Sequence, residues 1–250
     1  MSPPLLNLDR TLGWSAAALV TVFLIFELTP LDLWVQDRLF NFERGEWVVD
    51  GRNPEGRVLF YMGPKIAIIG FAVLLLVTLF VPARFRPRLP EWLRSRRRVI
   101  LTIVPLGLIP AFVGGVKATT NVFCPSEMRR YGGDVPYVRV LETYPPDDRP
   151  TRRGRCFPGG HASGGFALFA AAGLAATRRG QFVAIAFGLV VGSLMGGYQM
   201  AKGAHYLSHT LITALFAWFV AATFIMFTKW EEEHEENWTR LRRSIPPHNG

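Results

Sequence analysis

Charged residues are scarce in this sequence: they make up 19% of its 250 residues, whereas soluble domains carry about 25%. Half of the residues are hydrophobic, which excludes a disordered chain and disfavours a soluble two-domain enzyme. Only two cysteines are present, so a disulfide-rich scaffold is excluded, although one bridge can form. Internal repeats and low-complexity tracts are absent as well.

Acidic residues are outnumbered, because 28 Lys and Arg stand against 19 Asp and Glu, which gives a net charge of +9. A basic chain binds nucleic acid or an anionic membrane surface. The densest basic run holds seven arginines between Arg84 and Arg98 and lies between two apolar stretches. Membrane orientation explains that run, so we expect contact with membrane lipids and no nucleic-acid partner.

Six stretches are apolar enough to cross a membrane as helices, which takes roughly 20 residues each. The sequence therefore predicts an all-α integral membrane bundle of six helices. The first stretch lacks a small-residue cleavage site before Asp32, so we interpret it as a span and not as a secretory signal. The expected spans are approximately Leu12–Thr29, Val58–Val81, Val99–Lys117, Gly160–Thr177, Phe182–Ala201 and His205–Phe227.

Arginine placement predicts how these spans are oriented. The basic segment 84–98 and the pair Arg178 and Arg179 are expected in the cytoplasm, which places both termini there. Residues 1–228 then form the membrane domain and residues 229–250 a charged cytoplasmic tail, in what we expect to be a bacterial inner membrane. The outer loop 119–159 is basic too. Its charge is either surface charge that translocation tolerated or a means of attracting an anionic substrate.

Four ionisable side chains are expected at one depth near the outer face. Lys117 closes the third span, His161 opens the fourth, His205 opens the sixth, and His209 follows one turn later. Ionisable groups at membrane depth are costly and mark functional sites. The alternative is a snorkelling lysine and interfacial histidines, which explains one such residue better than four.

The residues around His161 and His205 suggest which ligands these side chains can bind. Pro158-Gly159-Gly160 forms a turn before a helix, and a helix N-terminus with accessible backbone N–H groups suits a phosphate, although such turns also serve purely structural roles. His205 and His209 share a helix face, which allows one to orient the other, both to bind a metal or a haem, or both simply to pack.

These segments resemble the type 2 phosphatidic acid phosphatase (PAP2) superfamily. Its three motifs are Lys, six residues, Arg-Pro; Pro-Ser-Gly-His; and Ser-Arg, five residues, His, three residues, Asp. This chain has Lys117, six residues, Cys124-Pro125; then Pro158-Gly159-Gly160-His161; then Tyr198-Gln199, five residues, His205, three residues, His209. The order and spacing of the motifs match the membrane branch of the superfamily over roughly residues 99–227. The residue types within the motifs indicate a divergent subgroup.

The resemblance implies a metal-independent phosphatase without a cofactor, acting on a lipid phosphate. His205 is then the nucleophile that forms a phosphohistidine, and His161 protonates the leaving oxygen and later activates water. Lys117 and the backbone N–H groups of Gly159 and Gly160 are expected to hold the phosphate oxygens.

The chain departs from the family at four motif positions. Cys124 and Gln199 stand where the family has arginines, Gly159 where it has serine, and His209 where it has aspartate. His209 can accept the Nδ1–H of His205 in place of the aspartate. Lys202 is the first candidate to replace the arginine missing at Gln199, and Arg129 or Arg130 can replace the one missing at Cys124. Arg155 is a third choice.

Cys124 and Cys156 both lie in the outer loop, beside the first and second motifs. An oxidising outer compartment permits a disulfide between them, and we expect one. The alternative is two unpaired thiols at the membrane edge.

Three functions remain open at this stage. The first is a membrane phosphatase or phosphotransferase whose site faces outward and whose substrates are lipid phosphates or diphosphates. The second is a non-catalytic relative that binds anionic lipid head groups, which the four motif departures favour. The third is a haem or metal protein that uses His205, His209 and His161. The sequence predicts no oligomeric state.

Overall fold

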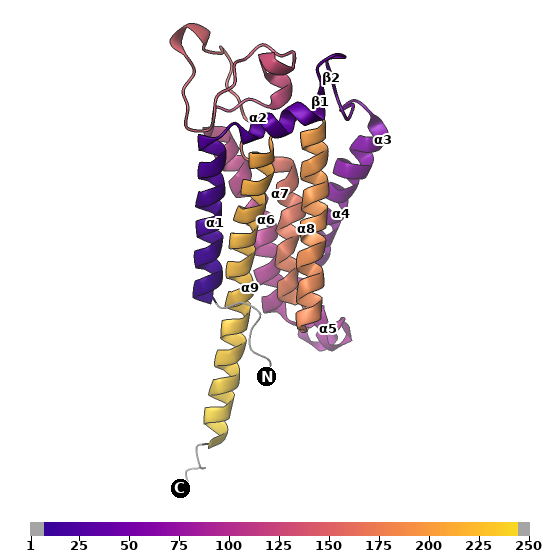
Figure 1. Ribbon diagram of the computed structural model, residues 1–250. Coiled ribbons are helices and arrows are strands. Elements are labelled where there is room, and N and C mark those ends of the chain that lie inside the picture. The colour runs from indigo at the N-terminus through magenta and orange to yellow at the C-terminus, as the bar shows by residue number, and fades with distance from the viewer. Residues whose placement is uncertain (1–7, 245–250) are drawn as a thin grey trace, which may run out of the picture.

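The computed structural model describes the backbone of residues 8–244 and the side chains of residues 10–228. Its long helices lie side by side, and a small antiparallel hairpin pairs Phe40 with Trp47 (Figure 1). The helices are α1 (Leu8–Leu28), α2 (Leu31–Gln36), α3 (Pro54–Arg57), α4 (Gly63–Leu79), α5 (Glu91–Arg94), α6 (Arg96–Thr119), α7 (Gly160–Ala167), α8 (Arg178–Ala201) and α9 (Leu207–Ser244), and the strands are β1 (Phe40–Asn41) and β2 (Glu46–Trp47).

Five helical stretches in the described residues are long and apolar enough to cross a membrane. They correspond to the first, second, third, fifth and sixth expected spans, so the prediction of an all-α membrane bundle is confirmed. A π-helical turn, Val58–Met62, joins α3 to α4 in the second of them. The five stretches are Arg10–Leu28, Pro54–Leu79, Arg96–Thr119, Arg178–Ala201 and Leu207–Thr228.

The fourth expected span, Gly160–Thr177, is not a continuous α-helix. α7 ends at Ala167 and gives way to a 3-10 helix, η7 (Leu168–Leu174). Because a 3-10 helix rises about 2.0 Å per residue against 1.5 Å for an α-helix, the two segments together cover about 26 Å, close to the hydrocarbon thickness of a bilayer. Most of their side chains are buried in protein, where a membrane tolerates irregular backbone.

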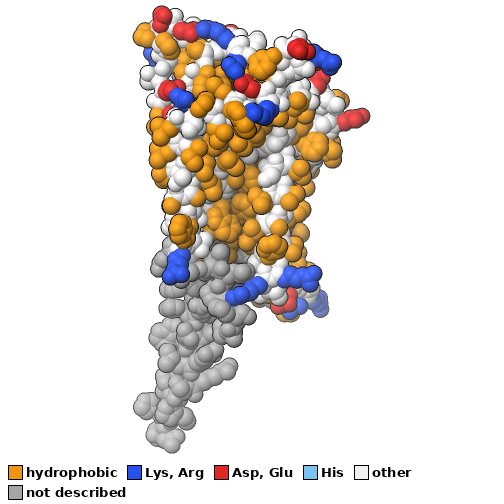
Figure 2. All heavy atoms as spheres, viewed as in Figure 1, with side chains coloured by type: hydrophobic (Ala, Val, Ile, Leu, Met, Phe, Trp, Pro, Cys, Tyr) orange, Lys and Arg blue, Asp and Glu red, His pale blue; other side chains and the backbone are white. Residues whose placement is uncertain are grey.

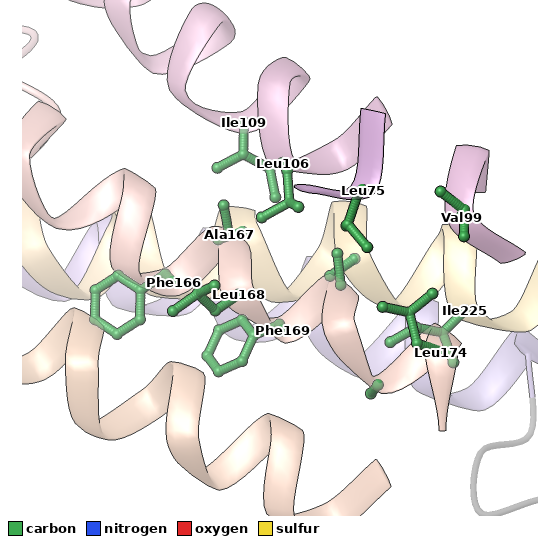
Figure 3. Close-up of a cluster of buried hydrophobic side chains, with 14 of the residues drawn as sticks. Leu75, Val99, Leu106, Ile109, Phe166, Ala167, Leu168, Phe169, Leu174 and Ile225 are labelled. Atoms are coloured by element: carbon green, nitrogen blue, oxygen red, sulfur yellow. The ribbon is translucent and has the colours of Figure 1, made fainter. Parts of the chain in front are cut away.

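The core of the bundle is built around α7 and η7. In Figure 3, Leu168 lies below Leu106 of α6, and Leu174 lies beside Ile225 of α9. Glycines bring α8 close to this layer: a Cβ on Gly192 would lie 2.2 Å from the ring of Phe166. Small residues at such contacts are typical of helix packing in membranes.

The outer surface has the composition of a membrane protein. Figure 2 shows a hydrophobic band across the bundle with charged side chains gathered above and below it. Large apolar residues such as Leu76, Val77 and Phe187 are about half exposed. Soluble monomers rarely expose so large a contiguous apolar surface, whereas the hydrocarbon core of a membrane accommodates it.

Extramembranous segments cover both ends of the bundle. At one end lie α2, the β1–β2 hairpin and the long loop between α6 and α7, and at the other end lies α5 (Figure 1). α9 runs without a break from Leu207 to Ser244 and projects beyond the other helices (Figure 1). The charged tail expected from residue 229 onward therefore continues the last membrane helix.

Candidate active site

The candidate site lies where four segments meet at one end of the bundle. Lys117 is in the last turn of α6, His161 is in the first turn of α7, His205 lies between α8 and α9, and His209 is in the first turn of α9. The structure therefore brings together the four ionisable side chains that the sequence places at one depth.

The three histidine rings form a chain. Nδ1 of His161 lies 3.1 Å from Nε2 of His205, and Nδ1 of His205 lies 3.4 Å from Nδ1 of His209. His205 and His209 are almost completely buried, each with 2% of its surface exposed, whereas His161 is partly exposed. Two arrangements of protons satisfy both contacts, because each histidine nitrogen can donate or accept. In the arrangement that leaves a lone pair on Nε2 of His205, His161 donates from Nδ1 to His205, and His205 donates from its own Nδ1 to His209.

Local backbone features hold His205 and His209 in place. α8 is followed by Gly203, whose φ of 73° is a left-handed conformation that favours glycine, and Gly203 lies against the indole of Trp47. α9 begins with a cap from α2, because the carboxylate of Asp32 accepts hydrogen bonds from the backbone N–H of Ser208, at 2.9 Å, and from its hydroxyl. Burial raises the pKa of Asp32 from 3.8 to about 6, although the bonds from Ser208 lower it.

The two glycines before His161 play different parts. The N–H of Gly159 donates to the carbonyl of His209, at 3.1 Å, and to Oγ1 of Thr213, at 3.0 Å. A side chain at Gly159 would press on that carbonyl, since a Cβ would lie 3.0 Å from its oxygen. Gly159 therefore ties α7 to α9 in this structure, and its N–H group is already occupied. Gly160 is the glycine that faces Lys117, whose Nζ lies 3.7 Å from the position of a Cβ there.

A cavity of about 340 Å³ opens beside His161. Its polar residues include Lys117, Gly160 and Ser163, and its remaining wall is apolar and comes mainly from α4 and α6. Two further side chains line the same space, namely Tyr61 of the π-helical turn before α4 and Lys65 of α4. The Tyr61 ring meets the His161 ring edge-on, with the centroids 4.9 Å apart.

Lys202 and Gln199 lie at the end of α8. Lys202 is half-buried, and its ammonium lies 5.2 Å above the ring of Tyr198. Burial, and to a smaller extent the charge of Arg57, lowers the pKa of Lys202. Gln199 is buried, and neither its amide nitrogen nor its amide oxygen has a hydrogen-bond partner. Such an orphaned buried amide is costly unless a ligand or water completes it.

The arginines considered as substitutes are engaged elsewhere or lie outside the cavity. Arg129 makes a bidentate ion pair with Asp148, and Arg130 makes one with Asp37 at 2.7 Å. The Arg130 guanidinium holds the pKa of Asp37 below its usual value. Arg155 is exposed and is not part of the cavity wall. The outer-loop arginines at 129 and 130 thus hold the loop together and do not reach His161.

Cys124 and Cys156 are joined in a disulfide, the pairing that the sequence analysis expects. Cys156 is completely buried, and its sulfur lies 3.5 Å from Nδ1 of His205. The bridge therefore forms part of the wall behind His205.

Among the described residues, one group of His, Cys, Asp or Glu side chains is close enough to share a metal ion, and it consists of Cys124, Cys156 and His205. The disulfide commits two of these three donors. The two nitrogens of His205 face different histidines, so a single ion cannot contact all three rings. The geometry therefore gives the metal or haem interpretation little support.

Tyr61, Lys65 and Asp32 are site residues that the sequence analysis does not single out. All three precede the motif segments in the chain, so no motif spacing points to them. For Lys65 a signal does exist, because it is one of only four lysines in the sequence.

Residues 98–233 match the family model described as the PAP2 superfamily. The match covers more than half of the chain and includes Lys117 and the three histidines, whereas α1 to α5 lie outside it. Neither the curated proteins nor the solved structures gave a match to this chain.

Proposed function

Because this chain belongs to the PAP2 superfamily, whose members are generally phosphatases, we propose that it is an integral membrane enzyme that removes phosphate from a lipid head group. The reaction passes through a phosphohistidine on His205 and uses no metal ion. The bond that breaks joins phosphorus to a lipid oxygen, in a phosphomonoester or a diphosphate.

The observation that carries this proposal is the mixed character of the cavity beside His161. One end offers Lys117, Lys65 and the N-terminus of α7, and the other end offers hydrocarbon from Ile69 and Leu106. A neighbouring apolar groove of about 780 Å³, lined by α4, η7 and α8, shares Ile68 with it. An amphiphile with a phosphate at one end and a hydrocarbon chain at the other fits both surfaces.

In the first step, Nε2 of His205 attacks phosphorus, and a nitrogen–phosphorus bond forms as the bond to the lipid oxygen breaks. His161 gives that oxygen a proton, so the lipid leaves as an alcohol or a lower phosphate. His209 accepts the Nδ1–H of His205, which keeps the lone pair of His205 on Nε2.

In the second step, water attacks the phosphohistidine. His161 takes a proton from the water, an oxygen–phosphorus bond forms, and the nitrogen–phosphorus bond breaks to release inorganic phosphate. Both histidines then return to their starting protonation states, so the cycle is balanced.

Charge stabilisation is the main task of the remaining residues. Lys117 lies beside Gly160 at the start of α7, where it can hold the non-reacting phosphate oxygens. Lys202 takes the place of the arginine missing at Gln199, and the unpartnered amide of Gln199 adds a hydrogen bond to the substrate. The backbone N–H of Gly160 and the positive end of α7 complete this anion site.

The orientation proposed for the enzyme places this site on the periplasmic side of a bacterial inner membrane, with both termini in the cytoplasm. Its support is the arginine run at 84–98 on the connection next to α5, at the opposite end of the bundle from the long loop. Reporter fusions after Arg88 and after Gly133 test it. Cytoplasmic activity of the first and periplasmic activity of the second are expected, and the reverse pattern contradicts the orientation.

Phosphate release by the detergent-purified full chain tests the function. The substrates are phosphatidate, phosphatidylglycerophosphate, undecaprenyl diphosphate and lipid A, each assayed in EDTA, with His205→Ala as the inactive variant and His234→Ala, in the charged tail, as the matched control. Release that survives EDTA and requires His205 is expected from one of these lipids. Release that EDTA abolishes, or that the His205→Ala variant retains, contradicts the mechanism.

Two other outcomes identify the alternatives. Phosphate transfer to an added lipid acceptor without net release indicates a phosphotransferase that uses the same phosphohistidine. Lipid binding without release or transfer indicates a non-catalytic relative, which the family departures at Cys124, Gly159, Gln199 and His209 would then explain.

A further inference from the structure

Lysine is rare in this chain, and its placement is selective. Of the 28 basic residues, 24 are arginines and four are lysines. Two of those four lysines, Lys65 and Lys117, line the cavity beside His161, and Lys202 follows directly after α8. Lysine carries a compact point charge, whereas the planar guanidinium of arginine suits bidentate pairing with carboxylates, as Arg129 and Arg130 show.

These three lysines lack acidic partners. Among the residues that the structure describes, no carboxylate oxygen lies within ion-pairing distance of Lys65, Lys117 or Lys202, whereas four arginines of the outer loop have acidic partners. Those four are Arg129, Arg130, Arg139 and Arg152, and their partners are Asp37, Glu127, Asp134, Glu142 and Asp148. Positive charges without acidic partners attract an anion, and two of these three lysines, Lys65 and Lys117, line the same cavity.

Lys65 stands on the face of α4 that lines the cavity. Lys65, Ile68 and Ala72 of α4 follow Tyr61 of the preceding π-helical turn at intervals of three or four residues, and all four line the cavity. The ammonium of Lys65 lies 5.7 Å from the centre of the Tyr61 ring, and that ring in turn contacts His161. Along this face the chemistry changes from a cation near the histidines to hydrocarbon further along the helix.

We propose that Lys65 is a phosphate-binding residue of this enzyme, contributed by a helix outside the matched residues 98–233. It holds a non-reacting phosphate oxygen on the side where the lipid chain leaves the site. With Lys117 and Lys202 it restores three positive charges around the phosphate, although arginines are missing at Cys124 and Gln199. This inference rests on the proposed function and extends its binding site to α4.

A different explanation for Lys65 is that it snorkels from the start of a membrane helix toward the water interface. Snorkelling would also leave the ammonium exposed, but it requires no contribution to anion binding. The two explanations therefore differ in what removal of the ammonium does to phosphate affinity.

The experiment measures the affinity of the detergent-purified full chain for inorganic phosphate. Thermal unfolding midpoints are recorded against phosphate concentration, with chloride added to hold the ionic strength constant. Lys65→Met should weaken phosphate binding by about tenfold or more, the usual cost of losing a charge-assisted contact. Lys65→Arg, which keeps the charge, should recover most of the affinity. Arg179→Met, at the opposite end of α8, is the matched control and should bind phosphate as the wild type does.

Wild-type phosphate affinity in Lys65→Met overturns the inference and favours snorkelling. If Lys65→Met does not fold, Lys65→Gln, which keeps a polar side chain of intermediate length, replaces it with the same expected loss. A wild type that binds phosphate through Lys65 but releases none from any lipid disproves the proposed function alone. A wild type that hydrolyses a lipid phosphate while Lys65→Met keeps its phosphate affinity disproves the role of Lys65 alone.

Discussion

His161 and His205 touch each other directly, with Nδ1 of the first 3.1 Å from Nε2 of the second. The proposed mechanism puts these two nitrogen-bearing rings on opposite sides of phosphorus, one attacking and one serving the leaving oxygen. A phosphoryl group does not fit into a 3.1 Å gap. On this mechanism the contact has to open when the substrate binds, and part of the binding energy is used to separate the rings.

We expect orthovanadate, a phosphate analogue, to break the His161–His205 contact. Nitrogen NMR of protein labelled in its histidines should show the Nε2 signal of His205 shift on addition of vanadate, because its hydrogen-bond partner changes. The His161→Asn variant, which lacks the original donor ring, provides the reference for the open state. An unchanged Nε2 signal at saturating vanadate contradicts this opening.

His209 is expected to act by fixing the proton position on His205. His209→Ala removes the acceptor that lies 3.4 Å from Nδ1 of His205, and kcat should fall at least about tenfold as the wrong tautomer becomes populated. His209→Asp restores the residue type of the family motif and should keep more activity than alanine. Equal kcat values for wild type and His209→Ala, measured with the same lipid, would show that His209 only packs.

Loss of the Cys124–Cys156 bridge should cost both stability and activity. The bridge joins residues 32 positions apart, and on the loop-entropy model its removal lowers the free energy of unfolding by roughly 3 to 4 kcal/mol. Activity should fall because Cys156 lies against His205. Reductant is added to the wild type and to the Cys124→Ser/Cys156→Ser double variant, and unfolding and phosphate release are measured. If reductant also affects the double variant, which has no disulfide, the reductant acts on something other than the Cys124–Cys156 bridge.

Asp32 predicts a pH dependence of stability. Its pKa is about 6 in the folded protein, against an ordinary value of 3.8 that applies to the unfolded chain. Between these two pH values the folded protein therefore binds more protons than the unfolded chain does. The free energy of unfolding should therefore fall as the pH rises from about 4 to 6, by up to about 3 kcal/mol, and stay low above that. Asp32→Asn cannot ionise and should lack this fall, whereas Asp50→Asn, an exposed control, should retain it. Thermal unfolding of all three proteins at pH 4 and pH 7 tests this pH dependence. Equal changes in stability for wild type and Asp32→Asn would disprove the role of Asp32.

Two glycines of α8 offer a matched test of helix packing. A Cβ on Gly192 would lie 2.2 Å from the Phe166 ring, whereas a Cβ on Gly197 would meet nothing within 4 Å. Gly192→Ala should therefore lower the free energy of unfolding by about 1 to 3 kcal/mol, and Gly197→Ala should be neutral or slightly stabilising. Thermal unfolding in detergent separates the two, and equal midpoints would show that α7 and α8 can move apart without cost.

The sequence predicts the parts of this protein that depend on local pattern. Apolar runs locate the long helices, and motif spacing locates Lys117, His161 and His205, because both depend on residues near one another in the chain. It does not predict that α7 continues as the 3-10 helix η7, since a run of Ala, Gly and Leu is compatible with either helix type.

Contacts between distant segments are harder to predict. Arg130 pairs with Asp37 across 93 positions, and Lys65 reaches the site from a helix that carries no motif. The sequence offers Arg130 as a substitute for a missing arginine, and nothing in the motif spacing points to Lys65. Only the packing of α4 against α6 and α7 brings Lys65 into the cavity, and that packing is set by shape and not by motif spacing.

The disulfide beside His205 also affects the stage of biogenesis at which the proposed enzyme becomes catalytically active. In the proposed orientation, residues 120–159 must be exported before Cys124 and Cys156 encounter oxidising conditions. A newly made chain that is still held on the cytoplasmic side then has an unfinished wall behind its nucleophile. On the proposed function and orientation, the enzyme would become active only at the end of biogenesis, and phosphorylated metabolites of the cytoplasm would not meet a working site while the chain is being inserted.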